Sequence, residues 1–306
     1  MVRPDQKRAA VKHLQSVVLD GQTQPLSQRA ACAILKVERA LVRKVPTQNQ
    51  KDAPLKQQLA TLSQQNPRYG YRRIHALVIG ADTGKGIGAD TGKGIGTDTG
   101  KRVNKKRVHR LWKAMQRQVV PRKKRRPRGA KAQSEALVAL YPGHIWSYDF
   151  VFDHLRNGTQ VKLLCLNDEF TRQCHAIEVG ASLPAGEVKR VLEREFQKHG
   201  APRFLRSDNG PEFKENGLQN WLQSQNVQPL YIEPGSPWQN GREESMHGKL
   251  RDECLDGELF GHRLETQVVV EGYRQHFNAH RPHSALGYQT PNQFAQNWTQ
   301  NQKTLT

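Results

Sequence analysis

The sequence has few of the features that mark membrane or secreted proteins. No run of 18 apolar residues occurs in its 306 residues, whereas a membrane-spanning helix needs about 20. The first ten residues, MVRPDQKRAA, lack the apolar stretch of a secretion signal. No amphipathic membrane-surface helix and no lipidation motif is found either. These absences argue against a membrane partner and predict a cytoplasmic protein.

Cysteine is scarce and scattered. The sequence contains only Cys32, Cys165, Cys174 and Cys254, with no C-x-x-C pair and no nearby paired histidine. This spacing argues against both a zinc site and a disulfide framework. We expect the four thiols to be small buried side chains in a reducing compartment.

Acidic residues are few relative to basic ones. The chain has 28 Asp and Glu against 48 Lys and Arg, a formal charge of +20 and a pI near 10.1. Such an excess favours a polyanionic partner, and nucleic acid is the foremost candidate. A chain of this length is expected to form two or three domains.

The basic residues are concentrated in one stretch. Fifteen Lys or Arg and no acidic residue lie between positions 101 and 131, with PRKKRRPRG at 121–129. This stretch is either a solvated linker or a contact to the DNA backbone, and the two interpretations are compatible. We interpret 121–135 as a basic linker that contacts phosphates, and its predicted DNA-binding residues are Lys123, Lys124, Arg125 and Arg126.

The amino-terminal part has apolar residues at helical spacing. A helical segment is predicted over 1–50, with Ser27 as an N-cap, and a second helical domain over 51–120, with Asn104 as an N-cap. The apolar positions are Leu14, Val17, Val18, Ala31, Ile34, Leu35, Ile74, Leu77, Val78, Val108, Leu111, Trp112 and Met115. Short basic helices suit a helix-turn-helix DNA reader, and an ordinary helical bundle fits equally well. For the DNA reader, the predicted DNA-contacting residues are Lys105, Lys106, Arg107 and Arg110.

An eight-residue repeat interrupts the second helical domain. Residues 80–87 read GADTGKGI, 88–95 repeat them, and 96–101 begin a third copy. Glycine-rich repeats this short bury little apolar surface, so a flexible loop is expected. The Gly-Lys pairs do not have the G-x-x-x-x-G-K-[ST] spacing of a phosphate-binding loop, which argues against nucleotide binding.

From about residue 136 to 300 the pattern is that of a mixed α/β domain. In IWSYDFVF the alternation puts Ile145, Ser147, Asp149 and Val151 on one face of a strand and the aromatic residues on the other. Two more strands follow, VKLLCLND and CHAIEV. A helix over 184–199, a strand RFLR, a helix over 218–225, a strand over 229–232 and a helix over 243–254 complete the pattern.

Three carboxylates have a spacing that suggests joint chemistry. Taken singly, Asp149 fits a strand edge, Asp208 fits a turn, and Glu244 fits the first turn of a helix. Thirty-five residues separate Asp208 from Glu244, and Arg251 follows Glu244 by seven, which puts both on one helix face.

These residues lie within runs that resemble the integrase-core transposases of bacterial insertion sequences, of the OrfB type with a D, D(35)E signature. The similar runs in the core are WSYDFVFD (146–153), DEFTRQCHAIEV (168–179), RSDNGPEF (206–213), PGSPWQNG (234–241), ESMHGKLRDECL (244–255) and RPHSALGYQTP (281–291). NPRYGYRRIHALV (66–78) and VNKKRVHRLWKAM (103–115) are similar to the helical domain that precedes the core in that family.

The resemblance implies a ribonuclease H-like core and a catalytic triad of Asp149, Asp208 and Glu244. These carboxylates would hold two Mg²⁺ ions, with Mn²⁺ as the alternative, for DNA strand cleavage and strand transfer. Lys249 and Arg251 are the predicted DNA contacts on the helix of Glu244. The resemblance also implies DNA ends and target DNA as partners, a homo-oligomer on DNA, nucleoid association, and an upstream OrfA-type partner, separate or fused by frameshifting.

Departures from the family pattern leave alternatives open. Glu243 precedes Glu244, so the third carboxylate could be shifted by one residue, although the family motif favours Glu244. The usual aromatic residue is Met246 here, and the repeat is longer than the expected turn. A DNA-binding protein without activity, acting as terminus binder or repressor, is the alternative function. A third possible function is that of a nuclease of the same fold that cleaves DNA but never joins strands.

Overall fold

The computed structural model describes residues 4–17, 24–43, 47–83, 103–119, 137–210, 212–232 and 241–305. The chain divides into two compact units, residues 1–60 and 61–306. The PRKKRRPRG segment, most of the glycine-rich repeat and the PGSPWQN segment lie outside the described residues. No described helix is both long enough and apolar enough to cross a membrane.

The first unit contains three short helices, α1 (Pro4–Leu14), α2 (Gln28–Ile34) and α3 (Arg39–Arg43), and the start of α4 (Thr47–Gln65). The Ser27 side chain accepts a hydrogen bond from the backbone N–H of Ala30 (3.3 Å), as expected of an N-cap. Val11, Ala31 and Cys32 are buried between the helices. Ile34 was expected on the apolar stripe but is 59% exposed, because α2 ends there.

The second unit begins with a helical pair, α5 (Tyr71–Thr83) and α6 (Lys105–Ala114), which contact each other. The Asn104 side chain caps α6 by accepting a hydrogen bond from the backbone N–H of Lys106 (2.8 Å). The apolar side chains of the pair are buried as expected, namely Ile74, Val78, Val108, Leu111 and Trp112. Leu77 and Met115 are half-buried.

The core of the second unit is a five-stranded sheet in the order β3-β2-β1-β4-β5. The antiparallel strands are β1 (Ile145–His154), β2 (Gln160–Asp168) and β3 (Cys174–Gly180). The short strands β4 (Phe204–Ser207) and β5 (Gln228–Tyr231) run parallel to β1. This mixed sheet with its flanking helices is the mixed α/β architecture that the sequence predicted.

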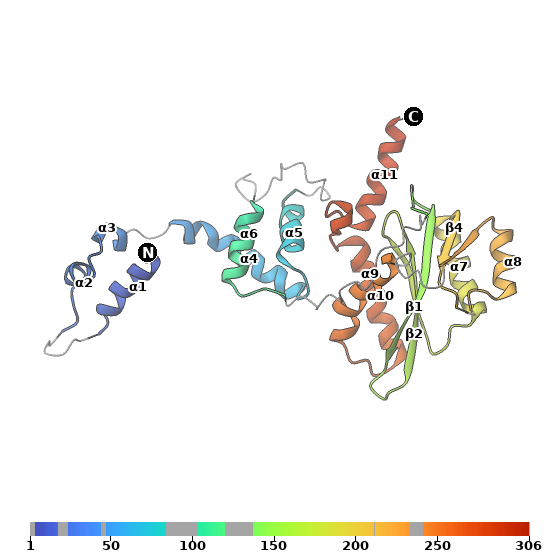
Figure 1. The fold of residues 1–306 in the computed structure, drawn as a ribbon, viewed down its shortest axis with the longest axis horizontal. Helices are drawn as coiled ribbons and strands as arrows, with labels where there is room; N and C mark the ends of the chain where they lie inside the picture. The colour runs from blue at the N-terminus through green and yellow to red at the C-terminus, as the bar shows by residue number, and fades with distance from the viewer. Residues whose placement is uncertain are drawn as a thin grey trace, which may run out of the picture. The chain divides into compact units, whose positions relative to one another are not determined.

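Two helical layers cover the two faces of the sheet (Figure 1). On one face, α7 (Ala185–His199) and α8 (Asn216–Ser224) pack on Trp146, Tyr148 and the other apolar side chains of that face. On the opposite face, α9 (Gly241–Glu253) and α10 (Arg263–Ala279) pack on Val151 and Leu163. The alternation along β1 therefore separates the two cores as predicted.

Short elements complete the carboxyl-terminal part. These are two 3-10 turns, η2 (Leu255–Gly257) and η3 (Ser284–Leu286), and the helix α11 (Pro291–Leu305). The RPHSALGY run supplies Arg281, whose side chain is 1% exposed and whose Nε and Nη2 donate to Glu253 on α9 (2.6 Å each). Arg73 of α5 donates to the same carboxylate (2.9 Å). This buried triad attaches the helical pair to α9.

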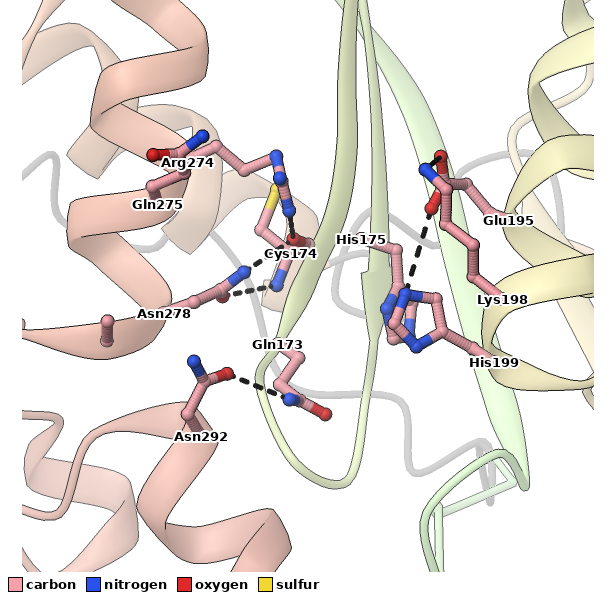
Figure 2. A pocket seen from close by; sticks show the side chains of 11 residues that line it. Gln173, Cys174, His175, Glu195, Lys198, His199, Arg274, Gln275, Asn278 and Asn292 are labelled. Carbon is pink, nitrogen blue, oxygen red and sulfur yellow. Dashed lines mark hydrogen bonds and ion pairs between the residues drawn. The ribbon is translucent and has the colours of Figure 1, made fainter.

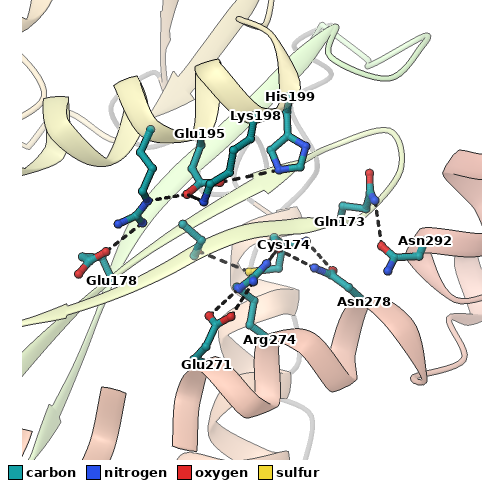
Figure 3. A network of polar contacts seen from close by, with 12 residues as sticks. Gln173, Cys174, Glu178, Glu195, Lys198, His199, Glu271, Arg274, Asn278 and Asn292 are labelled. Atoms are coloured by element: carbon teal, nitrogen blue, oxygen red, sulfur yellow. Dashed lines mark hydrogen bonds and ion pairs between the residues drawn. The ribbon is translucent and has the colours of Figure 1, made fainter. Parts of the chain in front are cut away.

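A polar network surrounds the edge strand β3 (Figure 3). On α10, the Asn278 side chain pairs with the backbone of Cys174 through two hydrogen bonds of 2.8 Å, and Arg274 donates to the Cys174 carbonyl (3.1 Å). On α7, Glu195 pairs with Lys198 (3.0 Å) and Arg194 (2.8 Å). All four cysteines are buried and free, as expected.

Candidate active site

Asp149 lies in the middle of β1 and its side chain is 18% exposed. Strand alternation directs it to the face covered by α9, together with Ser147 and Val151. Its Oδ1 accepts a hydrogen bond from the backbone N–H of Phe150 (2.7 Å). A carboxylate is thus held at the sheet surface, next to the helix that carries the other predicted site residues.

Asp208 is exposed and directly follows β4, the parallel neighbour of β1. Ser147 pairs with Arg206, so continuing the register by two residues sets Asp208 beside Asp149. Oδ1 of Asp208 accepts the backbone N–H of Gly210 (2.9 Å), which fixes the turn after the strand. The first predicted carboxylate therefore lies on β1 and the second in the turn that follows the neighbouring strand β4.

Glu244 lies in the first turn of α9 and is exposed. The helix continues through Gly248, so Arg251 lies two turns further along the same face. Nη2 of Arg251 donates to the carbonyl of Phe152 on β1 (2.8 Å). Lys249, also predicted to contact DNA, is half-buried and lies on a different side of α9.

The three predicted carboxylates are not gathered at one point. Among the residues that the structure describes, no group of three Asp, Glu, His or Cys side chains is placed to hold a metal ion. Asp149 lies on β1, Asp208 directly after β4 and Glu244 in the first turn of α9. The donor set still suits Mg²⁺ chemically, because carboxylate oxygens are hard ligands. The triad remains a prediction from the sequence.

Glu243 has a role that the sequence did not reveal. Its side chain is 2% exposed and accepts hydrogen bonds from the Ser147 hydroxyl and from the Asn167 amide (2.8 and 3.1 Å). Burial, and then the nearby charge of Asp149, raise the pKa of Glu243 to about 8. Glu243 thus joins α9 to β1 and β2, which leaves Glu244 as the exposed member of the pair.

His247 was also missed. Its Nδ1 lies 3.9 Å from Oδ2 of Asp149, and its Nε2 lies 3.7 Å from Oε2 of Glu243. Burial, followed by the charge of Arg251, lowers the pKa of His247 to about 4, so the imidazole is neutral near pH 7. The signal in the sequence was its position, four residues after Glu243 on the same helix.

A cavity of about 390 Å³ lies away from these carboxylates, at the edge strand β3 between α7 and α10 (Figure 2). Figure 2 shows His175 and His199 together on one side and Arg274 and Asn278 on the other. The cations on its wall already have partners, because Lys198 pairs with Glu195 (3.0 Å) and Arg274 with Glu271 (2.7 Å). This pocket therefore lacks the unpaired positive charge that a DNA contact needs.

The DNA contacts predicted in the helical pair lie on the outer side of α6. Lys105, Lys106 and Arg110 are exposed, and Arg107 is half-buried. Lys123, Lys124, Arg125 and Arg126 lie outside the described residues, so no observation bears on them.

Comparison with known proteins gives matches along most of the chain. Residues 140–237 and residues 225–291 match two families, each described as "Integrase core domain". An uncharacterized 39.2 kDa protein of insertion element IS476 from Xanthomonas euvesicatoria is 34% identical over 96% of this chain and 78% of that protein. An uncharacterized 31.7 kDa protein of insertion element IS407 from Burkholderia multivorans is 33% identical over 88% of this chain and 91% of that protein. Among solved structures, the HTLV-2 integrase catalytic core domain in complex with magnesium aligns with a TM-score of 0.43 at 18% identity, covering 51% of this chain and 98% of that one.

Proposed function

Because the chain belongs to the family of insertion-element transposase-like proteins with an integrase core domain, we propose that it cleaves DNA at the ends of its element and joins them to new DNA. The observation that carries this proposal is the strand register. Its continuation beyond the last pair, Ser147 with Arg206, would set Asp208 level with Asp149, on the face of the sheet covered by the helix of Glu244.

Asp149, Asp208 and Glu244 would hold two divalent ions, Mg²⁺ or Mn²⁺. Such a pair, about 3.5 to 4 Å apart, activates the attacking oxygen and stabilises the leaving oxygen in phosphoryl transfer. Three carboxylates repel one another, so their convergence requires the positive charge of the ions. Asp149 is held by β1 and Asp208 by the turn after β4, and the exposed Glu244 would approach them from α9.

The other residues of the site position these groups. Glu243 joins the first turn of α9 to Ser147, two residues before Asp149 on β1, and so sets the distance between the helix and the strand. Arg251 donates a hydrogen bond to the backbone carbonyl of Phe152, three residues after Asp149 on the same strand. Its guanidinium can contact a phosphate near the scissile bond through its remaining N–H groups.

The proposed partners are the DNA ends of the element and a target DNA, with the protein acting as an oligomer on DNA. The net charge of +20 supports a DNA partner. An upstream OrfA-type partner, separate or fused by frameshifting, is proposed from the family resemblance alone.

A gel assay with labelled DNA that carries the repeats flanking the gene tests this function. With Mg²⁺ or Mn²⁺, the protein should nick at the repeat boundary and join the 3′ end to new DNA. Asp208→Asn should abolish both reactions and leave DNA retention largely intact, because most phosphate contacts lie elsewhere. Cleavage without joining would favour the nuclease, and binding alone, with the upstream partner present, would favour the repressor.

A further inference from the structure

A second cavity, of about 230 Å³, lies against helix α9 on the side away from Glu244. Arg242, Ser245 and Lys249 line it from α9, whereas Glu244 and Arg251 do not. Lys249 follows Glu244 by five residues, which corresponds to a rotation of about 140° around the helix. We call this cavity the α9 pocket. It is therefore separate from the face that carries the predicted catalytic carboxylate.

Among the residues that the structure describes, two cations of the α9 pocket have no partner. Neither the ammonium of Lys249 nor the guanidinium of Arg172 makes a hydrogen bond or an ion pair with another described residue, although both side chains are half-buried. Arg172 lies in the turn between β2 and β3 with a φ of 63°, a conformation that non-glycine residues seldom adopt. The turn thus holds an arginine over the cavity that Lys249 reaches from α9.

Three carboxylates also line the pocket, and among the described residues none of them pairs with Lys249 or Arg172. Glu243 accepts hydrogen bonds from Ser147 and Asn167. Glu169 is shared between Arg206 (3.0 Å) and Arg242 (2.9 Å). The carboxylate of Asp168 accepts three backbone N–H groups, those of Gly143, Phe170 and Thr171 (2.6, 2.7 and 2.8 Å). With Arg206 counted beside the lining cations Arg172, Arg242 and Lys249, four positive charges face the three carboxylates, next to the buried Arg281.

The local electrostatics agree with this count. Burial, and then the charge of Arg281, lower the pKa of Lys249 to about 8, with further lowering by Arg73 and Arg172. The pKa of His283, which also lines the pocket, falls to about 2 through burial and the same four cations. Lys249 and Arg172 are half-buried with no carboxylate bonded to either among the described residues. This costs free energy, and an anion bonded to both would recover part of it.

We propose that the α9 pocket binds a backbone phosphate of DNA through the ammonium of Lys249 and the guanidinium of Arg172. For the presence of DNA this inference rests on the proposed function. A phosphate group fits a cavity of this volume and suits both donors. A DNA strand bound in this pocket would contact α9, and the other face of α9 carries Glu244. Binding here would therefore fix the position of the DNA relative to the predicted catalytic carboxylates.

Salt-dependent binding of the full-length protein to a duplex carrying the flanking repeat tests the α9 pocket. The variants are Lys249→Gln, Arg172→Gln, the double variant, and the control Arg190→Gln. Arg190 has a side chain 72% exposed and pairs with Glu187 on α7, so the control removes a charge of the same sign from another surface of the core. The magnitude of the slope of log K against the logarithm of the salt concentration should decrease by about 0.9 in the double variant, because one phosphate contact is lost. It should stay unchanged in the control.

Because Lys249 and Arg172 would share one phosphate, the two single variants should not be additive. The combined loss of binding should be smaller than the sum of the separate losses. A slope in the double variant equal to that of the control would overturn the proposal. The binding assay needs no catalysis, so an inactive protein with the expected slope change would refute the proposed function and leave the pocket standing.

Thermal unfolding separates a binding role from a structural one. Lys249→Gln removes a half-buried unpaired charge, so without added anion it should melt at the same temperature as the wild type or higher. A clearly lower melting temperature would show that Lys249 serves the fold and would contradict the proposal. If inorganic phosphate raises the melting temperature of the wild type but not of the double variant, while the DNA slope is unchanged, the pocket takes free phosphate and the assignment to DNA is wrong.

Discussion

The two neighbouring glutamates at the start of α9 differ in what their side chains touch. Glu243 accepts hydrogen bonds from Ser147 and Asn167 in the interior, whereas Glu244 is exposed. Glu243→Ala leaves both donors unpaired and should lower the free energy of unfolding by about 1 to 3 kcal/mol. Glu244→Ala should change it by less than about 0.5 kcal/mol. Urea denaturation of the two variants checks this, and the reverse order would contradict the assignment of roles.

His175 makes the stability of the fold sensitive to acid. Its side chain is 6% exposed, and its Nε2 has no hydrogen-bond partner among the described residues. Burial, then the charges of His199 and Arg274, lower its pKa to about 3, against about 6.5 in an unfolded chain. The unfolded state therefore binds the extra proton between these two values, so His175 favours folding above pH 6.5 and that contribution is lost as the pH falls toward 3.

His175→Phe removes this group and should flatten the pH dependence. Between about pH 6.5 and 3 the unfolding free energy of the wild type should fall more steeply than that of the variant, by up to about 1.4 kcal/mol per pH unit. Above pH 6.5 the two slopes should agree. Urea denaturation over a pH series measures both, and parallel curves throughout the acidic range would contradict the account of His175.

At the scale of elements, the attachment of the helical pair to the core depends on Glu253. Arg73 of α5 and Arg281 both donate to its carboxylate, whose side chain is 6% exposed. Glu253→Gln leaves the buried guanidinium of Arg281 without a counter-charge and should cost about 3 to 5 kcal/mol of unfolding free energy.

Asp252 provides a matched control for Glu253. It is the preceding residue of the same helix and pairs with Arg68, but that pair is more exposed, with side chains 39% and 23% accessible. Asp252→Asn should therefore cost no more than about 1 kcal/mol. Equal losses in the two variants, measured by urea denaturation, would show that the buried triad does not hold α5 to α9.

The sequence predicted the elements of the core well because their patterns are strong. Strand alternation located β1 and separated its two faces, and the helical spacing of Val188, Leu192 and Phe196 located α7. Helix α4 was not identified, although Leu55, Leu59 and Leu62 have helical spacing and the first two are buried. The glutamines around them and Pro54 made this short stripe easy to overlook.

The candidate site was predictable only in part. Spacing and motifs selected Asp149, Asp208 and Glu244, but sequence alone could not show that β4, which Asp208 follows, lies next to β1. The role of Glu243 depends on Ser147 and Asn167, which are 96 and 76 residues away in the chain. Arg172 and Lys249 meet only because the β2–β3 turn and α9 line the same cavity. Contacts of this kind follow from tertiary packing.

At the scale of the whole molecule, positive charge occurs in several parts of the chain. These are the exposed residues of α6, the α9 pocket and the PRKKRRPRG segment of the sequence. A protein that holds DNA at several points can lose one contact and still bind, with a smaller salt dependence. Loss of catalysis without loss of DNA binding is therefore the expected mark of a catalytic carboxylate.

The most direct test of the central claim compares Glu244→Gln with Glu243→Gln in the cutting and joining assay on flanking-repeat DNA. Glu244→Gln should bind DNA but neither cleave nor join it. Glu243→Gln keeps a carbonyl oxygen that can accept hydrogen bonds from Ser147 and Asn167, and it should retain both reactions. Activity that survives in Glu244→Gln, or is lost only in Glu243→Gln, would contradict the assignment of Glu244 as the third catalytic carboxylate.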